Sequence, residues 1–423
     1  MNEKEIKAQT KLIRQSCDII DSLLSPSTII KVNVGDNLAS IIEQAPEGAI
    51  LSIVPEYKTE ADLVLSKPIT LLSTKPISGR ASPLNQYPTV IGSLISKAPA
   101  SVTNLRLTGK IKEKTLVDSG DYLIFDRCLV IGSSLGQHRG ILTNAGNIVI
   151  KQCSVIGIID SIDTQALAAW DNCKNLLVDD CYLEASGENV LFGGADASSE
   201  NNIPQGITIS NCDLTKLLSW KGNPNITAKN LFEIKCARKV ILSNCNLSNS
   251  WTSGQDGYGI LLTVRNQDGN APFSTIEDVL ISNNTITNTV SGIQILGRDY
   301  TNPSQIMKRV NFKGNKFTNL NGGKQVFISN GSQSLTLDSN SFIGYNLNSA
   351  LNFDNPSNLN SGMIVKNNYF QEGDYGIFGT DAPSLGKAAI DMYAPGYLWD
   401  TNTIKKGTSG RNITYPNGTI LIP

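Results

Sequence analysis

The chain has 423 residues, a formal net charge of −1 and only 17% charged residues. This near-neutral balance gives no electrostatic reason to bind nucleic acid or an anionic membrane, so neither is an expected partner. The single histidine, His138, excludes a histidine metal cluster, and the eight cysteines include no Cys-x-x-Cys pair. We therefore predict no metal site and no cofactor.

Residues 1–25 are predicted to form an N-terminal α-helix that serves in attachment or oligomerisation. Ile6, Ile13, Cys17, Ile20 and Leu24 make one apolar stripe, and the segment Ser25-Pro26-Ser27 ends the helix. Two interpretations stay open: a cap laid over the first turn of the following domain, or a short coiled coil or docking peptide.

The beginning of the chain, MNEKEIKAQTKLIRQ, lacks an apolar core of signal-peptide length. No apolar run in the chain reaches transmembrane length. We therefore expect a protein made in a cytoplasm without a signal peptide.

Residues 28–73 are predicted to form the start and cap of the main domain. A strand is followed by a short helix over 37–45, a turn at Pro46-Glu47-Gly48, and further strands that end in KPITLLS.

From about residue 74 to residue 380 one pattern recurs: a strand, two or three polar residues, and a short second strand. It is visible in LIFDRCLVIG (123–132), VILSNCNLSN (240–249) and LTLDSNSFIG (335–344). The repeat spacing varies from about 25 to about 39 residues, which is typical of solenoids and propellers. One position of the repeat is occupied by Cys128, Cys153, Cys181, Cys212, Cys245, Asn284, Asn315, Asn340 and Asn368.

These repeats predict an all-β, single-stranded right-handed parallel β-helix over 74–380. No helical pattern separates the units, and neither a propeller-blade nor a leucine-rich signature is present. Stacked turns lie about 4.8 Å apart, so the polar residues form a corner whose Asn side chains hydrogen-bond along the stack. We expect Cys to fill the same place as a free buried thiol, since parallel stacked Cβ vectors suit disulfides poorly.

A further strand precedes each of these units, as in NLFEIK (230–235) and GILLTVRN (259–266). Alternation directs one set of side chains inward and the other outward. The outward set includes an apolar stripe, which soluble monomers rarely expose, so either loops or other subunits of a homotrimer must cover it. This stripe consists of Leu191, Leu261, Leu296, Phe327 and Phe378. Residues 381–423 are predicted to be an irregular C-terminal closing segment that protects the open edge.

The chain resembles the pectate-lyase-like right-handed parallel β-helix superfamily in VNVGDNLASIIEQAPEGAILSIVP and KPITLLS. ENVLFGGAD, KNLFEIKCARKV and LLTVRNQDGNAPF look like a group of uncharacterised bacterial β-helix repeat proteins. The superfamily includes lyases, glycoside hydrolases and phage tailspikes, so the resemblance implies the fold more than a function. Polygalacturonase-like and pectate-lyase motifs are not recognisable: Asp179-Asp180 lies at a corner, and His138 lies in Gln-His-Arg-Gly.

The candidate catalytic residues are Glu233, Asp268 and Asp299, because glycosidases need two carboxylates about 5–9.5 Å apart. The candidate glycan-binding residues are Lys235, Trp220, Trp251, Arg265, Arg298 and Asp354. Each candidate has a structural alternative. Glu233 pairs with Lys235, the arginines pair with Asp268 or Asp299, and the tryptophans anchor loops.

The leading functional hypothesis is a phage virion protein of the tailspike, fibre or decoration kind. Its loops would contact host-surface polysaccharide, and residues 1–25 would bind other virion proteins. The protein would be made in the host cytoplasm and located in the virion. The alternatives are a bacterial polysaccharide lyase or glycoside hydrolase, and a non-catalytic structural or adhesive β-helix.

Overall fold

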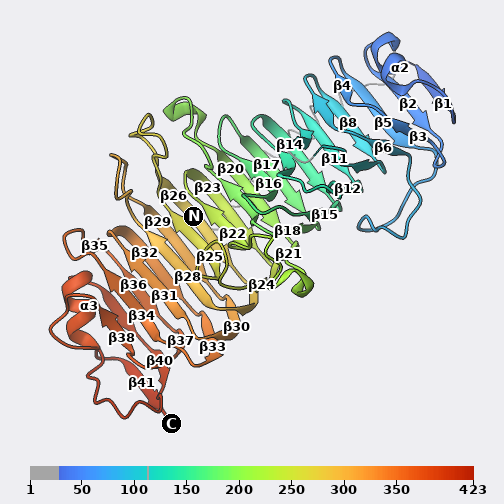
Figure 1. Ribbon diagram of the computed structural model, residues 1–423. Helices are drawn as coiled ribbons and strands as arrows, with labels where there is room; N and C mark the ends of the chain where they lie inside the picture. The colour runs from blue at the N-terminus through green and yellow to red at the C-terminus, as the bar shows by residue number, and fades with distance from the viewer. Residues whose placement is uncertain (1–27, 112–113) are drawn as a thin grey trace. The chain divides into compact units, whose positions relative to one another are not determined.

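The computed structural model describes residues 28–111 and 114–423. They form two compact units: an N-terminal unit of residues 28–190 and 204–227, and a C-terminal unit of residues 191–203 and 228–423. In each unit the chain visits three parallel sheets in turn, here called sheets A, B and C (Figure 1). The helix predicted over 1–25 lies outside the described residues.

In the N-terminal unit, sheet A contains β1 (Ile29–Val32), β2 (Ala49–Ile53), β5 (Ile69–Ser73), β8 (Ala100–Thr103), β11 (Leu123–Asp126), β14 (Gly146–Lys151), β17 (Lys174–Asp179) and β20 (Gln205–Ser210). Sheet B contains β3 (Lys58–Glu60), β6 (Thr89–Ile91), β9 (Arg106–Thr108), β12 (Leu129–Ile131), β15 (Ser154–Ile158), β18 (Tyr182–Ala185) and β21 (Asp213–Thr215). Sheet C contains β4 (Leu63–Leu65), β7 (Leu94–Ser96), β10 (Thr115–Asp118), β13 (Arg139–Leu142), β16 (Gln165–Ala169) and β19 (Glu188–Phe192), whose last two residues belong to the other unit. The helices are α2 (Leu38–Gln44) and the 3-10 turn η2 (Leu218–Trp220).

In the C-terminal unit, sheet A contains β23 (Ala237–Ser243), β26 (Ile276–Ser282), β29 (Lys308–Lys313), β32 (Ser332–Asp338), β35 (Asn360–Ser361), β36 (Ile364–Lys366) and β39 (Leu398–Asp400). Sheet B contains β24 (Asn246–Ser250), β27 (Thr285–Thr289), β30 (Lys316–Asn321), β33 (Ser341–Tyr345), β37 (Tyr369–Gln371), β40 (Asn402–Lys405) and β41 (Thr419–Ile422). Sheet C contains β22 (Phe232–Ile234), β25 (Tyr258–Thr263), β28 (Ser291–Leu296), β31 (Lys324–Ser329), β34 (Ser349–Asp354) and β38 (Ile377–Gly379). The helices are the 3-10 turn η1 (Glu200–Asn202) and α3 (Lys387–Tyr393).

The short helix predicted over 37–45 is confirmed as α2. Asn37 is its N-cap, and the Asn37 side chain accepts a hydrogen bond of 3.1 Å from the Ser40 amide. Leu38 and Ile42, four residues apart on one face, are both buried.

The core of each unit is built from columns of apolar side chains, because parallel strands stack in register. In sheet A of the C-terminal unit, Val240 pairs with Val279, which pairs with Val310, and all three are buried. In sheet B, the rings of Phe317 and Phe342 stack with centroids 4.5 Å apart and planes 11° apart. The alternation that placed these residues inward therefore holds, and the right-handed parallel β-helix is confirmed.

In most turns, the corner between sheets A and B is made by one left-handed residue followed by one buried polar or thiol side chain. Asn244 has φ 55°, and Cys245 follows it; Asn283 has φ 57°, and Asn284 follows it. The backbone thus changes direction in one residue without reversing, which lets the next strand enter sheet B.

In the C-terminal unit the buried corner residues are hydrogen-bonded from turn to turn. The Asn315 Oδ1 atom accepts from the Asn284 amide at 3.1 Å and from Asn284 Nδ2 at 3.0 Å. Asn315 Nδ2 donates to the Ile281 carbonyl at 2.8 Å and to Asn340 Oδ1 at 2.9 Å. Asn340 bonds to Asn368 in the same way, so the buried carboxamides satisfy one another.

In four turns of the N-terminal unit the same corner is filled by a thiol, that of Cys128, Cys153, Cys181 or Cys212. The Cys128 amide donates to the Cys153 sulfur at 3.4 Å, and the Cys153 amide donates to the Cys181 sulfur at 3.4 Å. These thiols are free and buried, as predicted.

Residues 381–423 differ from the irregular segment that we predicted. They contain α3 and three strands, of which β39 continues sheet A and β40 and β41 continue sheet B. Asn402 continues the carboxamide column, because its Oδ1 accepts from the Asn368 amide at 3.0 Å. The repeat therefore runs beyond residue 380.

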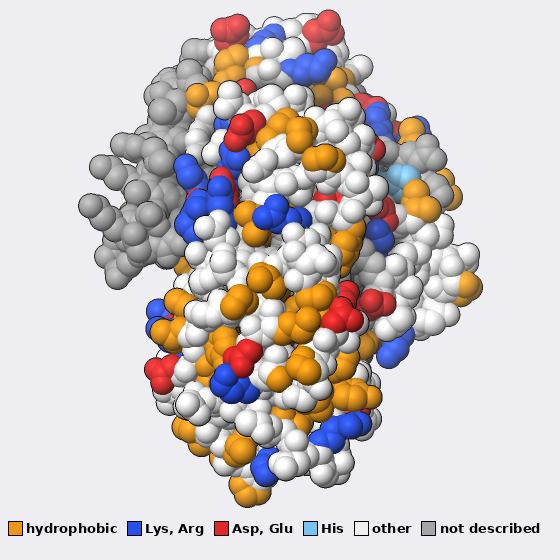
Figure 2. All heavy atoms as spheres, turned by 90° about the vertical axis from the view of Figure 1, so that its left-hand side faces the viewer, with side chains coloured by type: hydrophobic (Ala, Val, Ile, Leu, Met, Phe, Trp, Pro, Cys, Tyr) orange, Lys and Arg blue, Asp and Glu red, His pale blue; other side chains and the backbone are white. Residues whose placement is uncertain are grey.

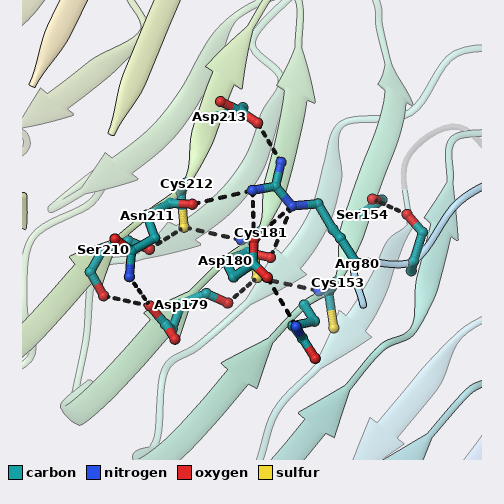
Figure 3. A network of polar contacts seen from close by, with 12 residues as sticks. Arg80, Cys153, Ser154, Asp179, Asp180, Cys181, Ser210, Asn211, Cys212 and Asp213 are labelled. Carbon is teal, nitrogen blue, oxygen red and sulfur yellow. Dashed lines mark hydrogen bonds and ion pairs between the residues drawn. The ribbon is translucent and has the colours of Figure 1, made fainter. Parts of the chain in front are cut away.

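A segment between β5 and β6 crosses the thiol corner of the N-terminal unit (Figure 3). The Arg80 guanidinium contacts the carboxylates of Asp180, at 2.7 Å, and of Asp213. The Ser154 hydroxyl donates to the Ala81 carbonyl at 2.6 Å. These contacts fasten several successive turns with one strap, defined here as residues 74–88.

Candidate functional site

A cleft of about 610 Å³ lies over the outward face of β22, β25 and β28 in the C-terminal unit. Strand residues form its floor, and the loops before β25, after β25 and after β28 form its walls. Its lining consists of Glu233, Lys235, Gly254, Gln255, Asp256, Leu261, Thr263, Arg265, Gln267, Gln294, Asp299, Thr301 and Asn302.

Glu233 is fixed in the floor of the cleft by two neighbours. Its side chain is 1% exposed, and its Oε2 atom accepts a hydrogen bond of 2.8 Å from Asn230 Nδ2. Lys235, two residues along on the same face, places its Nζ 4.0 Å from Glu233 Oε1. The predicted pairing of Glu233 with Lys235 is therefore present, and Asn230, which also donates to Gln255, is a positioning residue that the sequence analysis missed.

Asp299 is held in the wall of the cleft as a carboxylate. It accepts hydrogen bonds of 2.9 Å from the amides of Asn266 and Thr301, and Arg265 lies 3.4 Å away. Burial raises the pKa of Asp299, but the two amides and the Arg265 charge outweigh burial and hold that pKa below its ordinary value. A carboxyl group with a lowered pKa suits charge pairing or nucleophilic attack better than proton donation.

Asp268 is not among the cleft-lining residues, although Arg265 and Gln267 in the same loop are. Its backbone amide donates to Asp196 Oδ2 at 3.0 Å, and the amides of Gln267 and Asn270 donate to the same carboxylate. Asp196 thus pins the loop that carries Gln267 over the cleft. Only the spatial proximity of residues 196 and 267 reveals this role, since nothing in the local sequence signals it.

The two tryptophans that were candidates for glycan binding are both buried. Trp220 is 8% exposed in the N-terminal unit, and Trp251 is 7% exposed in the C-terminal unit. This burial fits the alternative in which they anchor loops, because large aromatic rings gain most by burial.

The remaining candidates lie outside this cleft. Arg298 is half-buried and is not among its lining residues, and its carbonyl accepts from Asn330 Nδ2 at 2.9 Å. Asp354 lines a second cleft in the same unit and accepts a hydrogen bond of 2.8 Å from Thr380 Oγ1. Glu233, Lys235, Arg265 and Asp299 are therefore the predicted residues that the fold brings together.

The predicted exposed apolar stripe is largely covered. Leu191, Leu261 and Leu296 are 3%, 5% and 2% exposed, while Phe327 and Phe378 remain half-buried. The wall residues 254–256, Asp299, Thr301 and Asn302 line the cleft together with Leu261, so loops of the same chain shield this part of the face. These three leucines therefore no longer need other subunits to cover them, and they give no support to a homotrimer.

On the face shown in Figure 2, cationic, anionic and hydrophobic side chains are interspersed among other side chains and backbone. Over residues 28–111 and 114–423, no group of three His, Cys, Asp or Glu side chains is arranged to hold a metal ion. Within the same residues, no helix is both long and apolar enough to cross a membrane.

The fold and the cleft together define a right-handed parallel β-helix protein with a polar groove on the outward face of sheet C. Among solved structures, the chain is similar to the catalytic unit of a GH87 α-1,3-glucanase from Streptomyces thermodiastaticus, with a TM-score of 0.57 and 12% identity, over 93% of this chain and 67% of that one. It is also similar to the Dettilon tailspike protein (TM-score 0.47, 13% identity, 93% of this chain and 68% of that one). A third similar structure is an alginate lyase from a Paenibacillus species (TM-score 0.44, 13% identity, 76% of this chain and 97% of that one).

No protein-family model matches the sequence, and the search of curated proteins found no match. At identities this low, the structural likeness establishes the fold alone.

Proposed function

We propose that the protein binds polysaccharide in the cleft over β22, β25 and β28. The observation that carries this proposal is the lining: fixed carboxylates, two cationic side chains and several amides face one open groove. Sugars present many hydroxyl groups, and such a groove offers them both hydrogen-bond donors and acceptors. Its positive and negative side chains are mixed, so neither sign of charge dominates. The similarity to the catalytic unit of a GH87 α-1,3-glucanase agrees with this choice of ligand.

We further propose that the polysaccharide lies on a host cell surface and that the protein is a phage virion component of the tailspike, fibre or decoration kind. The support is the β-helix shaft and the apolar stripe predicted over residues 1–25, which suits attachment to other virion proteins. Assembly as a homotrimer belongs to the same proposal. Light scattering of the full chain and of a chain starting at Thr28 tests it: monomers in both samples would contradict it.

Polysaccharide binding is tested by calorimetry against a panel of purified bacterial capsular and O-chain polysaccharides. The Arg265→Ala variant should bind the best ligand roughly ten- to a hundredfold more weakly, since a charge-assisted hydrogen bond contributes roughly 1.5–3 kcal/mol. Arg309→Ala is the matched control, because Arg309 lies on β29 of sheet A and pairs with Asp278. The proposal fails if no polysaccharide binds, or if both variants bind like the unmodified protein.

A second candidate function, a polysaccharide lyase or glycoside hydrolase, is favoured by the carboxylates that share the cleft. Glu233 is buried beside Asn230, and Asp256 and Asp299 line the same space. Enzymatic cleavage requires such groups as general acid, base or nucleophile. Release of reducing ends or unsaturated products from the bound polysaccharide, lost in Glu233→Gln, would establish catalysis. Binding without product release would leave a non-catalytic receptor.

A further inference from the structure

A second cleft of about 530 Å³ lies on the same face of the same sheet, over β31, β34 and β38. Its character differs from that of the first cleft, because three aromatic rings contribute to it. Its lining consists of Lys324, Phe327, Asn348, Asn352, Asp354, Tyr375, Phe378 and Thr380.

The two clefts share one row of outward-facing positions. Glu233 pairs in register with Leu261, and Leu261 pairs with Gln294 in the first cleft. Gln294 pairs with Phe327, whose row continues through Asn352 to Phe378 in the second cleft. Five inter-strand spacings of about 4.8 Å place Glu233 and Phe378 roughly 24 Å apart. That span suits an oligosaccharide rather than a single sugar.

The floor of the second cleft presents aromatic rings on either side of an amide. Asn352 lies between Phe327 and Phe378 in the row, and the Tyr375 and Phe378 rings lie 5.6 Å apart at 58°. Phe327 and Phe378 are half-buried, so each exposes part of its ring to the cleft. A flat ring packs against the apolar C–H face of a pyranose, and a carboxamide offers its hydroxyls both a donor and an acceptor.

The charges of the second cleft are balanced, and they act across the border between the clefts. The Lys324 ammonium lies 4.0 Å from the centre of the Phe327 ring. Burial lowers the pKa of Lys324. The negative charges of Asp256 in the first cleft and Asp354 in the second act in the opposite direction and raise it. Asp256 is therefore within electrostatic reach of the second cleft. One cation beside one carboxylate favours an uncharged sugar over an anionic one.

We propose that the two clefts are parts of one groove that runs across the strands, in which the second cleft stacks an uncharged pyranose of the same polysaccharide strand held by the first. The groove would thus recognise a linear oligosaccharide segment with polar substituents at the Glu233 end and an apolar ring face at the Phe378 end. This inference rests on the proposed function, since it names the ligand geometry of the polysaccharide site.

The test uses the full chain and oligosaccharides of increasing length, made by partial hydrolysis of the best-bound polysaccharide of the panel. For the unmodified protein, affinity should keep rising until the oligosaccharide spans both clefts. Phe378→Leu keeps apolar volume but loses the flat ring, and it should weaken binding of long oligosaccharides roughly three- to tenfold. It should leave short oligosaccharides unaffected, a pattern that a general loss of structure does not produce.

Tyr375→Ala serves as a second variant if Phe378→Leu fails to fold, and it should act in the same direction. Tyr345→Leu is the matched control, because Tyr345 is 53% exposed on β33 of sheet B. If Arg265→Ala weakens binding while Phe378→Leu and Tyr375→Ala bind every length like the unmodified protein, the second cleft is not a subsite and this inference is wrong. If the unmodified protein binds no polysaccharide, the proposed function fails and the inference fails with it.

Discussion

The corner after sheet A is filled mostly by thiols in the N-terminal unit and mostly by carboxamides in the C-terminal unit. Cys153 and Asn315 occupy equivalent positions, and each accepts a hydrogen bond from the amide of the preceding corner residue. The carboxamide of Asn315 bonds four groups, whereas the Cys153 sulfur has longer and weaker contacts. The comparison shows that one backbone corner accepts two chemistries, and that they should differ in how much stability each residue contributes.

The largest effect is expected for Asn315→Ala in the C-terminal unit. The substitution leaves two Asn284 donors and the Ile281 carbonyl without their partners inside a buried column. Each buried unsatisfied group costs about 1–3 kcal/mol, so the loss of partners for three groups should lower the free energy of unfolding by at least about 3 kcal/mol. Guanidinium unfolding followed by circular dichroism measures this loss.

Asn315→Cys is the control that carries the chemistry of the other unit into this corner. A thiol accepts an amide weakly and donates to a carbonyl, as Cys153 does to Phe125 at 3.2 Å. It should therefore recover part of the stability that alanine loses. Equal unfolding free energies for the two variants would show that the carboxamide contacts are not what stabilises the corner.

An intermediate effect is expected for Arg80→Ala, which loosens the strap over the thiol corner. The Arg80 side chain is 27% exposed and that of Asp180 is 35% exposed, so solvent screens the pair. At up to about 1 kcal/mol for each of the two ion pairs, with Asp180 and with Asp213, the loss should be about 1–2 kcal/mol at neutral pH. Burial raises the pKa of Asp180, but hydrogen bonds from Gln152 and Arg80 and the Arg80 charge lower it overall.

A lowered folded-state pKa gives this contact a definite pH dependence. The stabilisation is present above the unfolded-state pKa of Asp, about 3.9, and is lost as the pH falls through the lower folded-state value. The difference between Arg80→Ala and the unmodified protein should therefore be constant from pH 5 to 7 and shrink below about pH 4. A difference that grows on acidification would contradict this assignment.

The smallest effect is expected for Cys153→Ala. The sulfur is fully buried, but its contacts are weak, so its removal should cost about 1 kcal/mol. Burial raises the pKa of the Cys153 thiol well above its ordinary value. Iodoacetamide should accordingly leave Cys153 unmodified in the native protein and alkylate it after unfolding, as mass spectrometry would show. Rapid native alkylation would mean that the corner opens.

The sequence predicted the fold well because the repeat is local. The alternation of apolar residues and the Cys or Asn position are both visible within each short repeat. The inward face and the column of corner residues could therefore be predicted from the sequence. Asn402 was missed because loops and α3 interrupt the repeat before it. Loop packing was less accessible: Leu296 lies outward by alternation, yet it is 2% exposed in the folded chain.

The site was predicted only in part, because part of it depends on how the loops pack. Glu233 and Lys235 lie two residues apart on one strand face, so their pairing was predictable. The roles of Asn230 and Asp196 depend on how loops return to the sheet, and Asp196 acts on amides more than 70 residues away. Trp220 and Trp251 likewise needed the loop conformation to show that they are buried.

The in-register stacking of sheet C has a consequence for how such a protein can evolve. Each turn of the coil contributes one position to the row from Glu233 to Phe378. Duplicating or deleting a whole turn would lengthen or shorten that row by one position and leave the neighbouring positions intact. The recognition surface is therefore modular: its reach can change by gene duplication in steps of one turn, while single substitutions adjust what each step contacts.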